Sequence, residues 1–198
     1  IYYNALEKLI RFQIEFGTQG IVICSSTGEG LLLTQEERIG IIKQTINIST
    51  IPVLVGCSSC STTDAIDNIK IAQDLGADGV LVTAPYYVKP TQNGIIQHFE
   101  TIVQSTDIPI VVYNIPSRVT VNLELDTLLH LSKLPNIVAL KDSTTQFDIL
   151  SMLHILAPTM PILSGDDATL PACLAHGASG TISAAANAYP KLIYNIVD

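Results

Sequence analysis

Short runs of β-branched and other apolar residues alternate along this chain with longer segments of helical periodicity, and this alternation restricts the possible folds most. The runs occupy residues 20–23, 52–55, 79–82, 109–112, 137–140, 161–163 and 180–182. Because polar residues do not alternate with apolar ones inside them, both faces of each strand are expected to be buried, as in a parallel sheet. Parallel strands need a long crossover between them, which is usually a helix. The sequence therefore predicts consecutive βα repeats.

The segments between the runs carry residues that are typical of helix ends. Thr34 is a candidate N-cap, and Glu37 is the matching acid of a capping box. Another helix is expected to begin at Thr63 and to stop at Gly76. Further helices are expected over residues 5–16, 123–131 and 147–156. No linker or change in composition interrupts the repeats, so a single domain is expected over residues 1–198.

The spacing of the runs, roughly 20–30 residues, favours a (β/α)8 TIM barrel over a doubly wound sheet. The chain also lacks the Gly-x-Gly-x-x-Gly turn that would support a doubly wound sheet. A complete barrel needs about 250 residues. This chain has 198, begins in a helix-like segment and ends in another after Pro190. We therefore expect the first strand and the C-terminal helical region to be missing from it.

Composition excludes several classes of protein. The chain has 10 basic and 18 acidic residues, and its formal charge of −8 leaves little positive charge to attract a nucleic acid. With 47% hydrophobic and 14% charged residues it should bury a core rather than stay disordered. No apolar run reaches the roughly 18 residues of a membrane span. The 4 cysteines are too few for a disulfide scaffold, so a cytoplasmic setting is expected, with Cys24 and Cys173 as core residues.

The active site of such a barrel gathers at the carboxyl ends of its strands. Lys141 directly follows the apolar run 137–140. An ammonium group held near an apolar interior loses hydration, which lowers its pKa, and the neutral amine can then form a Schiff base with a carbonyl. The alternative is a lysine at the rim that pairs with Asp142.

Other polar side chains end neighbouring runs, and each has a structural alternative. Tyr113 would relay protons, or it would be a buried tyrosine with one satisfied hydroxyl. Thr27 would bind a carboxylate or join the relay, or would only shape a turn. Arg118 would hold a carboxylate with its planar fork, or would be an ordinary surface arginine. Tyr86 and Tyr87 would reach into a site or an interface, or would simply pack.

No metal site is expected. Cys57 and Cys60 form a C-x-x-C pattern that would need two more ligands. Asp166 and Asp167 are expected to organise a loop rather than to bind metal, because aspartate is common in such turns. The histidines are widely separated in the sequence: His98, His130, His154 and His176.

Four short motifs occur in order along the chain. They are Ser-Ser-Thr-Gly-Glu at 25–29, Tyr-Asn-Ile-Pro at 113–116, Ala-Leu-Lys-Asp-Ser at 139–143 and Ser-Gly-Asp-Asp at 164–167. Together they resemble the G-T-T-G-E, Y-N-x-P, lysine and G-D-D/G-D-E motifs of the dihydrodipicolinate synthase/N-acetylneuraminate lyase family of Schiff-base aldolases and lyases. The resemblance extends over essentially the whole chain.

The resemblance implies a role for each matching residue. Lys141 would form the Schiff base with pyruvate, without any other cofactor, and Tyr113 would be the central acid and base. Thr27 would link Tyr113 to Tyr87, which in this family enters the site of a neighbouring subunit and completes the proton relay. A homotetramer built from tight dimers would follow.

The same resemblance implies how the substrates are held. Ser26 and Thr27 would bind the pyruvate carboxylate, and the backbones of Gly165 and Ile182 would line its pocket. Arg118 is similar to the arginine with which the synthase branch binds the carboxylate of L-aspartate-4-semialdehyde. The reaction implied is condensation of the two substrates to 4-hydroxy-tetrahydrodipicolinate, in diaminopimelate and lysine biosynthesis. The alternatives are another pyruvate aldolase, of the 2-keto-3-deoxy-sugar-acid or N-acetylneuraminate type, or a non-catalytic remnant of a decayed gene.

Some positions depart from the family pattern. Ser25 replaces the usual glycine, and Ser26 replaces the usual first threonine while keeping a hydroxyl. In lysine-inhibited members, histidine and asparagine residues line the regulatory site. The matching positions here are Gln35, Arg38 and Cys60. Feedback by lysine is therefore expected to be weak or absent.

Overall fold

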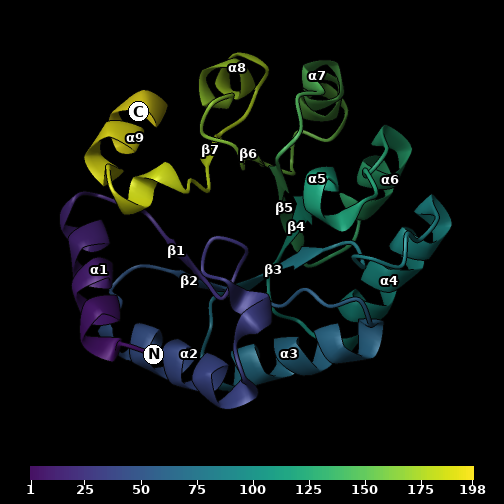
Figure 1. The fold of residues 1–198 in the computed structure, drawn as a ribbon. Coiled ribbons are helices and arrows are strands. Elements are labelled where there is room, and N and C mark those ends of the chain that lie inside the picture. Colours follow the sequence, from purple (N-terminus) through teal and green to yellow (C-terminus); the bar gives the residue numbers. More distant parts are fainter.

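The computed structural model describes all 198 residues. Its centre is one parallel sheet whose strand order is the order of the chain, β1-β2-β3-β4-β5-β6-β7. The strands are β1 (Ile21–Ile23), β2 (Val53–Gly56), β3 (Gly79–Thr83), β4 (Ile110–Asn114), β5 (Ile137–Asp142), β6 (Ile162–Ser164) and β7 (Gly180–Thr181). Figure 1 shows the sheet curled into an incomplete ring with helices around its outside. The predicted (β/α) barrel architecture is confirmed, and each of the seven runs contains a strand.

The helices alternate with the strands as the βα repeats require. They are α1 (Tyr3–Glu15), α2 (Gln35–Ile48), α3 (Thr62–Asp74), α4 (Gln92–Ser105), α5 (Pro116–Val119), α6 (Leu125–Leu131), α7 (Phe147–Leu156), α8 (Leu170–Ala175) and α9 (Pro190–Val197), with short 3-10 turns η1 (Gly30–Leu32) and η2 (Ala185–Asn187). None of these helices combines the length and the apolar character that a bilayer crossing requires.

Local chemistry explains the helix ends. The capping box before α2 is confirmed, because the Thr34 hydroxyl accepts from the Glu37 amide at 3.2 Å and the Glu37 carboxylate accepts from the Thr34 amide at 3.0 Å. The predicted start of α3 at Thr63 is one residue late, since the Ser61 hydroxyl caps the helix. The helix predicted from residue 123 begins only at Leu125, because the amide of Leu123 is bound by the Asn114 side chain.

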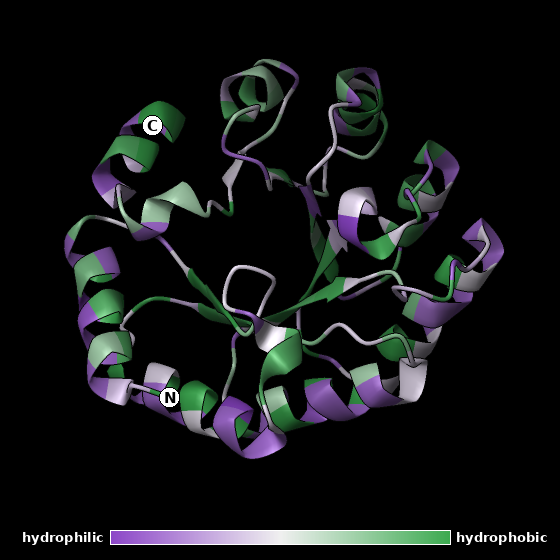
Figure 2. Cartoon of the chain, in the orientation of Figure 1, coloured by the Kyte–Doolittle hydropathy of each residue, from purple (hydrophilic) through white to green (hydrophobic).

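Two apolar clusters hold the fold together. The larger one, of 29 buried residues, fills the space between the strands and the helices and includes the predicted core residues Cys24 and Cys173. The smaller one lies on the inner face of the ring and contains Leu81, Val111, Tyr113, Ile115, Val119 and Ala139. Figure 2 shows the matching pattern, with hydrophobic strands inside and hydrophilic helix faces outside. The polar side chains described below lie next to this inner cluster.

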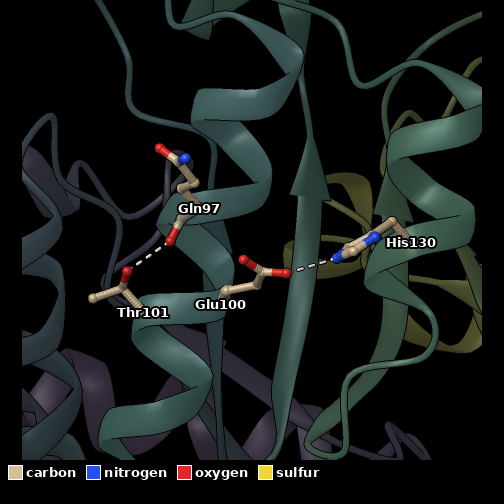
Figure 3. Close-up of polar contacts among 4 residues, drawn as sticks. All are labelled: Gln97, Glu100, Thr101 and His130. Carbon is tan, nitrogen blue, oxygen red and sulfur yellow. Dashed lines mark hydrogen bonds and ion pairs between the residues drawn. The ribbon is translucent and has the colours of Figure 1, made fainter.

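Helices α4 and α6 are joined by a polar contact on the outside of the ring (Figure 3). His130 Nε2 lies 2.8 Å from a carboxylate oxygen of Glu100, and both side chains are partly exposed. On α4 itself the Thr101 hydroxyl donates to the carbonyl of Gln97 at 2.7 Å. Exposed pairs of this kind contribute at most about 1 kcal/mol. The packing of the buried faces, rather than these contacts, therefore fixes the helix ring.

Candidate active site

The register between β4 and β5 brings the two principal predicted residues together. Tyr113 is the direct cross-strand partner of Lys141. The Lys141 Nζ atom lies 4.0 Å from the centroid of the Tyr113 ring. Both side chains therefore occupy the inner face of the ring, where a cation above an aromatic face is stabilised by the ring quadrupole.

Burial changes the chemistry of Lys141. The residue is 7% exposed, and loss of hydration lowers the pKa of its amine from 10.5 to about 8, an effect that the Asp167 carboxylate opposes. No carboxylate lies within ion-pair distance of it. Asp142 instead accepts hydrogen bonds from Asn114 Nδ2 and the Thr144 amide, both at 2.8 Å. The structure thus contradicts the alternative of a rim lysine paired with Asp142.

Tyr113 is buried beside three polar groups. Burial raises the pKa of its phenol, while the hydroxyls of Ser143 and Ser26 and the positive charge of Arg118 act to lower it. The loop hydroxyl that influences Tyr113 is therefore Ser26, whereas Thr27 had been expected to provide this link. The phenol of Tyr113 thus lies among groups with opposite effects on its pKa.

Two cavities meet at the loop that follows β1. One, of about 490 Å³, is lined by Tyr113, Ser26 and Arg118. The other, of about 610 Å³, is lined by Lys141 and Thr27. Ser25 borders both. Figure 1 shows this loop, between β1 and η1, in the middle of the ring of strands.

Gly165 and Ile182, which were predicted to line the pyruvate pocket, lie near Lys141 and at its cavity, respectively. A Cβ atom on Gly165 would be only 2.9 Å from Cε of Lys141, and closer still to Oγ of Ser143. Glycine is therefore needed at this position to leave space next to the amine. Ile182 lines the same cavity as Lys141, and its side chain packs against the inner apolar cluster.

Arg118 and Tyr87 have different positions relative to the cavities. Arg118 lies in α5, lines the cavity that contains Tyr113, and has no ion-pair partner. Tyr87 is 86% exposed, has a positive φ of 71° and lines neither cavity of this chain. Its neighbour Tyr86 does line the cavity with Arg118. Of the predicted site residues, Tyr87 is the one that the fold does not bring to the others.

A buried polar pair supports the site from the opposite face of the strands. Asn114 and Asp142 are cross-strand partners, one residue beyond Tyr113 and Lys141. The Asn114 side chain also donates to Asn122 Oδ1 at 2.9 Å and accepts from the Leu123 amide. This network locks the register that places Lys141 over Tyr113. The motifs that contain Asn114 and Ser143 gave no role to either residue, although strand alternation from Lys141 places Ser143 on the same face.

The acidic loop after β6 has the structural role that was expected. Asp167 accepts hydrogen bonds from the Ser183 hydroxyl and from the Ala185 amide, the latter at 2.8 Å. Asp166 accepts from the Thr169 hydroxyl at 3.0 Å. The loop thus joins the ends of β6 and β7 and places one carboxylate near Lys141.

Arg38 is a buried cation at the edge of the first cavity. It is 8% exposed and donates to the carbonyl of Gly56 and to Cys57 Sγ, the latter at 3.6 Å. Its Nε atom is buried without a partner. Cys57 is buried as well, whereas Cys60 is exposed, so the two thiols of the C-x-x-C pattern lie in different environments.

Comparisons with known proteins agree with this geometry. The model of the dihydrodipicolinate synthetase family matches residues 1–198. The 4-hydroxy-tetrahydrodipicolinate synthase of Clostridium novyi is 41% identical over 201 residues, which are 100% of this chain and 68% of that protein. The crystal structure of dihydrodipicolinate synthase from Aquifex aeolicus has a TM-score of 0.95 at 41% identity and covers 98% of this chain, which spans 68% of it.

A second solved structure carries a ligand. The chloride-inhibited dihydrodipicolinate synthase of Acinetobacter baumannii, complexed with pyruvate, has a TM-score of 0.95 at 39% identity and covers 98% of this chain and 68% of its own. The family match covers all seven strands, including β4 and β5, which carry Tyr113 and Lys141. The chain belongs to the dihydrodipicolinate synthetase family.

Proposed function

We propose that this chain condenses pyruvate with L-aspartate-4-semialdehyde to 4-hydroxy-tetrahydrodipicolinate, in diaminopimelate and lysine biosynthesis. The observation that carries the proposal is a buried lysine with a lowered pKa, facing a buried tyrosine at a cavity. The similar synthases of Clostridium novyi and Aquifex aeolicus, and the pyruvate complex of the Acinetobacter baumannii enzyme, support the choice of reaction. The covalent step uses Lys141 itself, so no separate cofactor is needed.

The chemistry begins with the neutral amine of Lys141. It attacks the ketone carbon of pyruvate, and the resulting carbinolamine loses water to form a protonated imine. Loss of a proton from the methyl group gives an enamine, which attacks the aldehyde carbon of the second substrate. The amino group of that substrate then attacks the imine carbon, closes the ring and releases Lys141. We assign to Tyr113 the transfer of protons during carbinolamine formation and dehydration, because its ring lies under the Lys141 amine.

Binding of the substrates follows from the polar groups around the two cavities. We assign the pyruvate carboxylate to the hydroxyls of Ser26 and Thr27, beside the space that Gly165 and Ile182 leave open. Because Ser26 is the loop hydroxyl that influences Tyr113, we also assign it the first position of the proton relay. Arg118 would hold the carboxylate of the aldehyde substrate.

The relay and the assembly are linked through Tyr87. Its side chain projects from the molecule next to exposed Val88, and Leu31 and Leu32 are exposed as well. We propose that this tyrosine enters the site of a second copy, as part of a homotetramer made of tight dimers. The compartment proposed is the cytoplasm, where an exposed free thiol such as Cys60 can persist.

The proposed function can be tested in two steps. The chain is incubated with pyruvate and borohydride, and the modified peptide is located by mass; the expected result is a reduced pyruvate adduct on Lys141. Turnover is then compared between aspartate semialdehyde and the aldehydes that sugar-acid aldolases use. An adduct combined with preference for a sugar aldehyde would identify a different pyruvate aldolase, and a folded chain without an adduct would overturn the Schiff-base function.

Arg118 should determine the use of the second substrate. Replacing it by alanine is expected to raise KM for aspartate semialdehyde about 10- to 100-fold, which corresponds to the loss of a charge-assisted hydrogen bond. The yield of trapped pyruvate should not change, because Arg118 belongs to the other cavity. Arg11→Ala, which removes an exposed pair with Glu7, is the matched control. An equal loss with both substrates would contradict this assignment.

Lysine should inhibit the reaction weakly or not at all. The positions that match the regulatory residues of lysine-inhibited relatives include Arg38, whose buried guanidinium borders the cavity. A second cation placed against it would be repelled. The check is an assay of initial rates with and without millimolar lysine. Strong inhibition would show that Arg38 does not exclude the amino acid.

A further inference from the structure

Ser143 continues the β5 strand beyond its last paired residue. Its amide donates to the carbonyl of Asn114 at 2.9 Å, which extends the pairing with β4. Successive side chains of a strand point to opposite faces, so Ser143 shares its face with Lys141. Since Tyr113 is the direct cross-strand partner of Lys141, Ser143 is its diagonal neighbour.

The hydroxyl of Ser143 has no hydrogen-bond partner although it is buried. Buried polar groups are nearly always paired, so such an atom needs an explanation. Its surroundings supply one. A Cβ atom on Gly165 would contact both Oγ of Ser143 and Cε of Lys141. The hydroxyl and the reactive lysine therefore border the same space, which a glycine keeps open.

The phenol of Tyr113 is a titratable group within reach of this hydroxyl. The Ser143 hydroxyl lowers the pKa of Tyr113, as does Ser26. A phenol oxygen can donate one hydrogen bond and accept others, so two serine hydroxyls can serve it at once. Ser26 comes from the loop after β1, whereas Ser143 comes from the strand that carries Lys141.

We propose that Ser143 is a positioning residue of the proton relay: its hydroxyl turns to donate a hydrogen bond to the phenol oxygen of Tyr113 and holds that oxygen for proton transfer. The effect of this hydrogen bond on catalysis rests on the proposed function. The bond strengthens as Tyr113 gives up its proton, because a hydrogen bond to a charged acceptor is about twice as strong as one between neutral groups. Ser143 thus stabilises the phenolate during dehydration of the carbinolamine and releases it when the proton returns.

The test uses Ser143→Ala in the full chain, with Ser132→Ala on the outside of the ring as the matched control. Ser132 donates only to the carbonyl of Leu129. The ¹³Cζ resonance of Tyr113, assigned by comparison with Tyr113→Phe, is titrated by NMR. The expected result is a higher phenol pKa in Ser143→Ala than in the wild type or the control. Loss of one such bond should also lower kcat about tenfold. KM for pyruvate should change little, and the pH profile of kcat should shift.

Ser143→Thr keeps a hydroxyl and should restore the Tyr113 resonance and most of kcat. Ser143→Ala with an unchanged Tyr113 titration and pH profile would overturn the proposal. The titration needs no turnover, so it tests the Ser143–Tyr113 hydrogen bond independently of the proposed function. A wild-type chain that traps no pyruvate would instead overturn the proposed function.

Discussion

Replacing Lys141 by methionine is expected to abolish the pyruvate adduct that borohydride traps and to reduce turnover to background. Methionine matches much of the length of the buried side chain but has no amine, so no Schiff base can form. The adduct is measured by the mass of the labelled peptide. Lys191→Met is the matched control, since the Lys191 Nζ atom also lies over a tyrosine ring, 4.5 Å from the centroid of Tyr194. An undiminished adduct in Lys141→Met would show that another amine is the nucleophile.

The pH dependence of adduct formation follows from the same burial. Only the neutral amine attacks the ketone, and burial lowers the pKa of Lys141 to about 8. The initial rate of trapping should therefore rise with pH and level off above a midpoint near pH 8. A midpoint above pH 10 would show that the amine is hydrated in solution as an ordinary lysine is.

Lys141→Met should also stabilise the folded protein at neutral pH. The folded pKa of Lys141 is below the unfolded value, so the unfolded state binds more protons between the two, and stability rises with pH from about 8 to 10.5. Below that range the buried ammonium costs about 3 kcal/mol, from the 1.36 kcal/mol that each unit of pKa represents. Urea unfolding of Lys141→Met at pH 7 should reveal this gain. A loss of stability would mean that packing around the amine outweighs its desolvation.

Replacing Tyr113 by phenylalanine has the second largest expected effect. The ring and its contacts with the inner apolar cluster remain, while the hydroxyl that transfers protons is lost. General acid–base groups contribute about 10²- to 10⁴-fold, and kcat should fall within this range. Lys141 is still present, so the borohydride adduct should form slowly but reach completion.

Tyr189→Phe is the control for this variant, because Tyr189 is exposed and far from both strands of the site in sequence. Stopped-flow measurement of imine formation separates the two expected effects, a slow dehydration and an intact nucleophile. Turnover of Tyr113→Phe within a few-fold of the wild type would assign the proton transfers to another group.

The sequence predicted the architecture well because the strands are apolar, and β3 and β4 are buried along their whole length, although Val138 of β5 is exposed. Such strands appear as apolar runs with few polar residues. Lys141 was recognisable for the same reason, as a charge that directly follows the run 137–140. Tyr113 ends the preceding strand, and the register that pairs it with Lys141 follows from consecutive parallel strands.

The loop after β1 could not be predicted to the same degree. Cys24 and Glu29 adopt positive φ angles of 54° and 50°, which few residues other than glycine favour. The backbone of this loop determines which of its hydroxyls lies near Tyr113, and there Ser26 rather than Thr27 affects the pKa of the phenol. The role of Ser143 was missed because it depends on what lies across the space beside Gly165.

The strand order of the sheet also determines how Lys141 and Tyr113 come together during folding. Every strand pairs only with its neighbours in the chain, so no pairing requires a distant segment to arrive first. Each pairing closes a loop of one βα unit, which costs less entropy than closing a longer loop between distant strands. Lys141 and Tyr113 belong to consecutive units, and docking of β5 on β4 is the one step that unites them. During refolding, the ability to capture pyruvate should thus emerge with this single middle pairing.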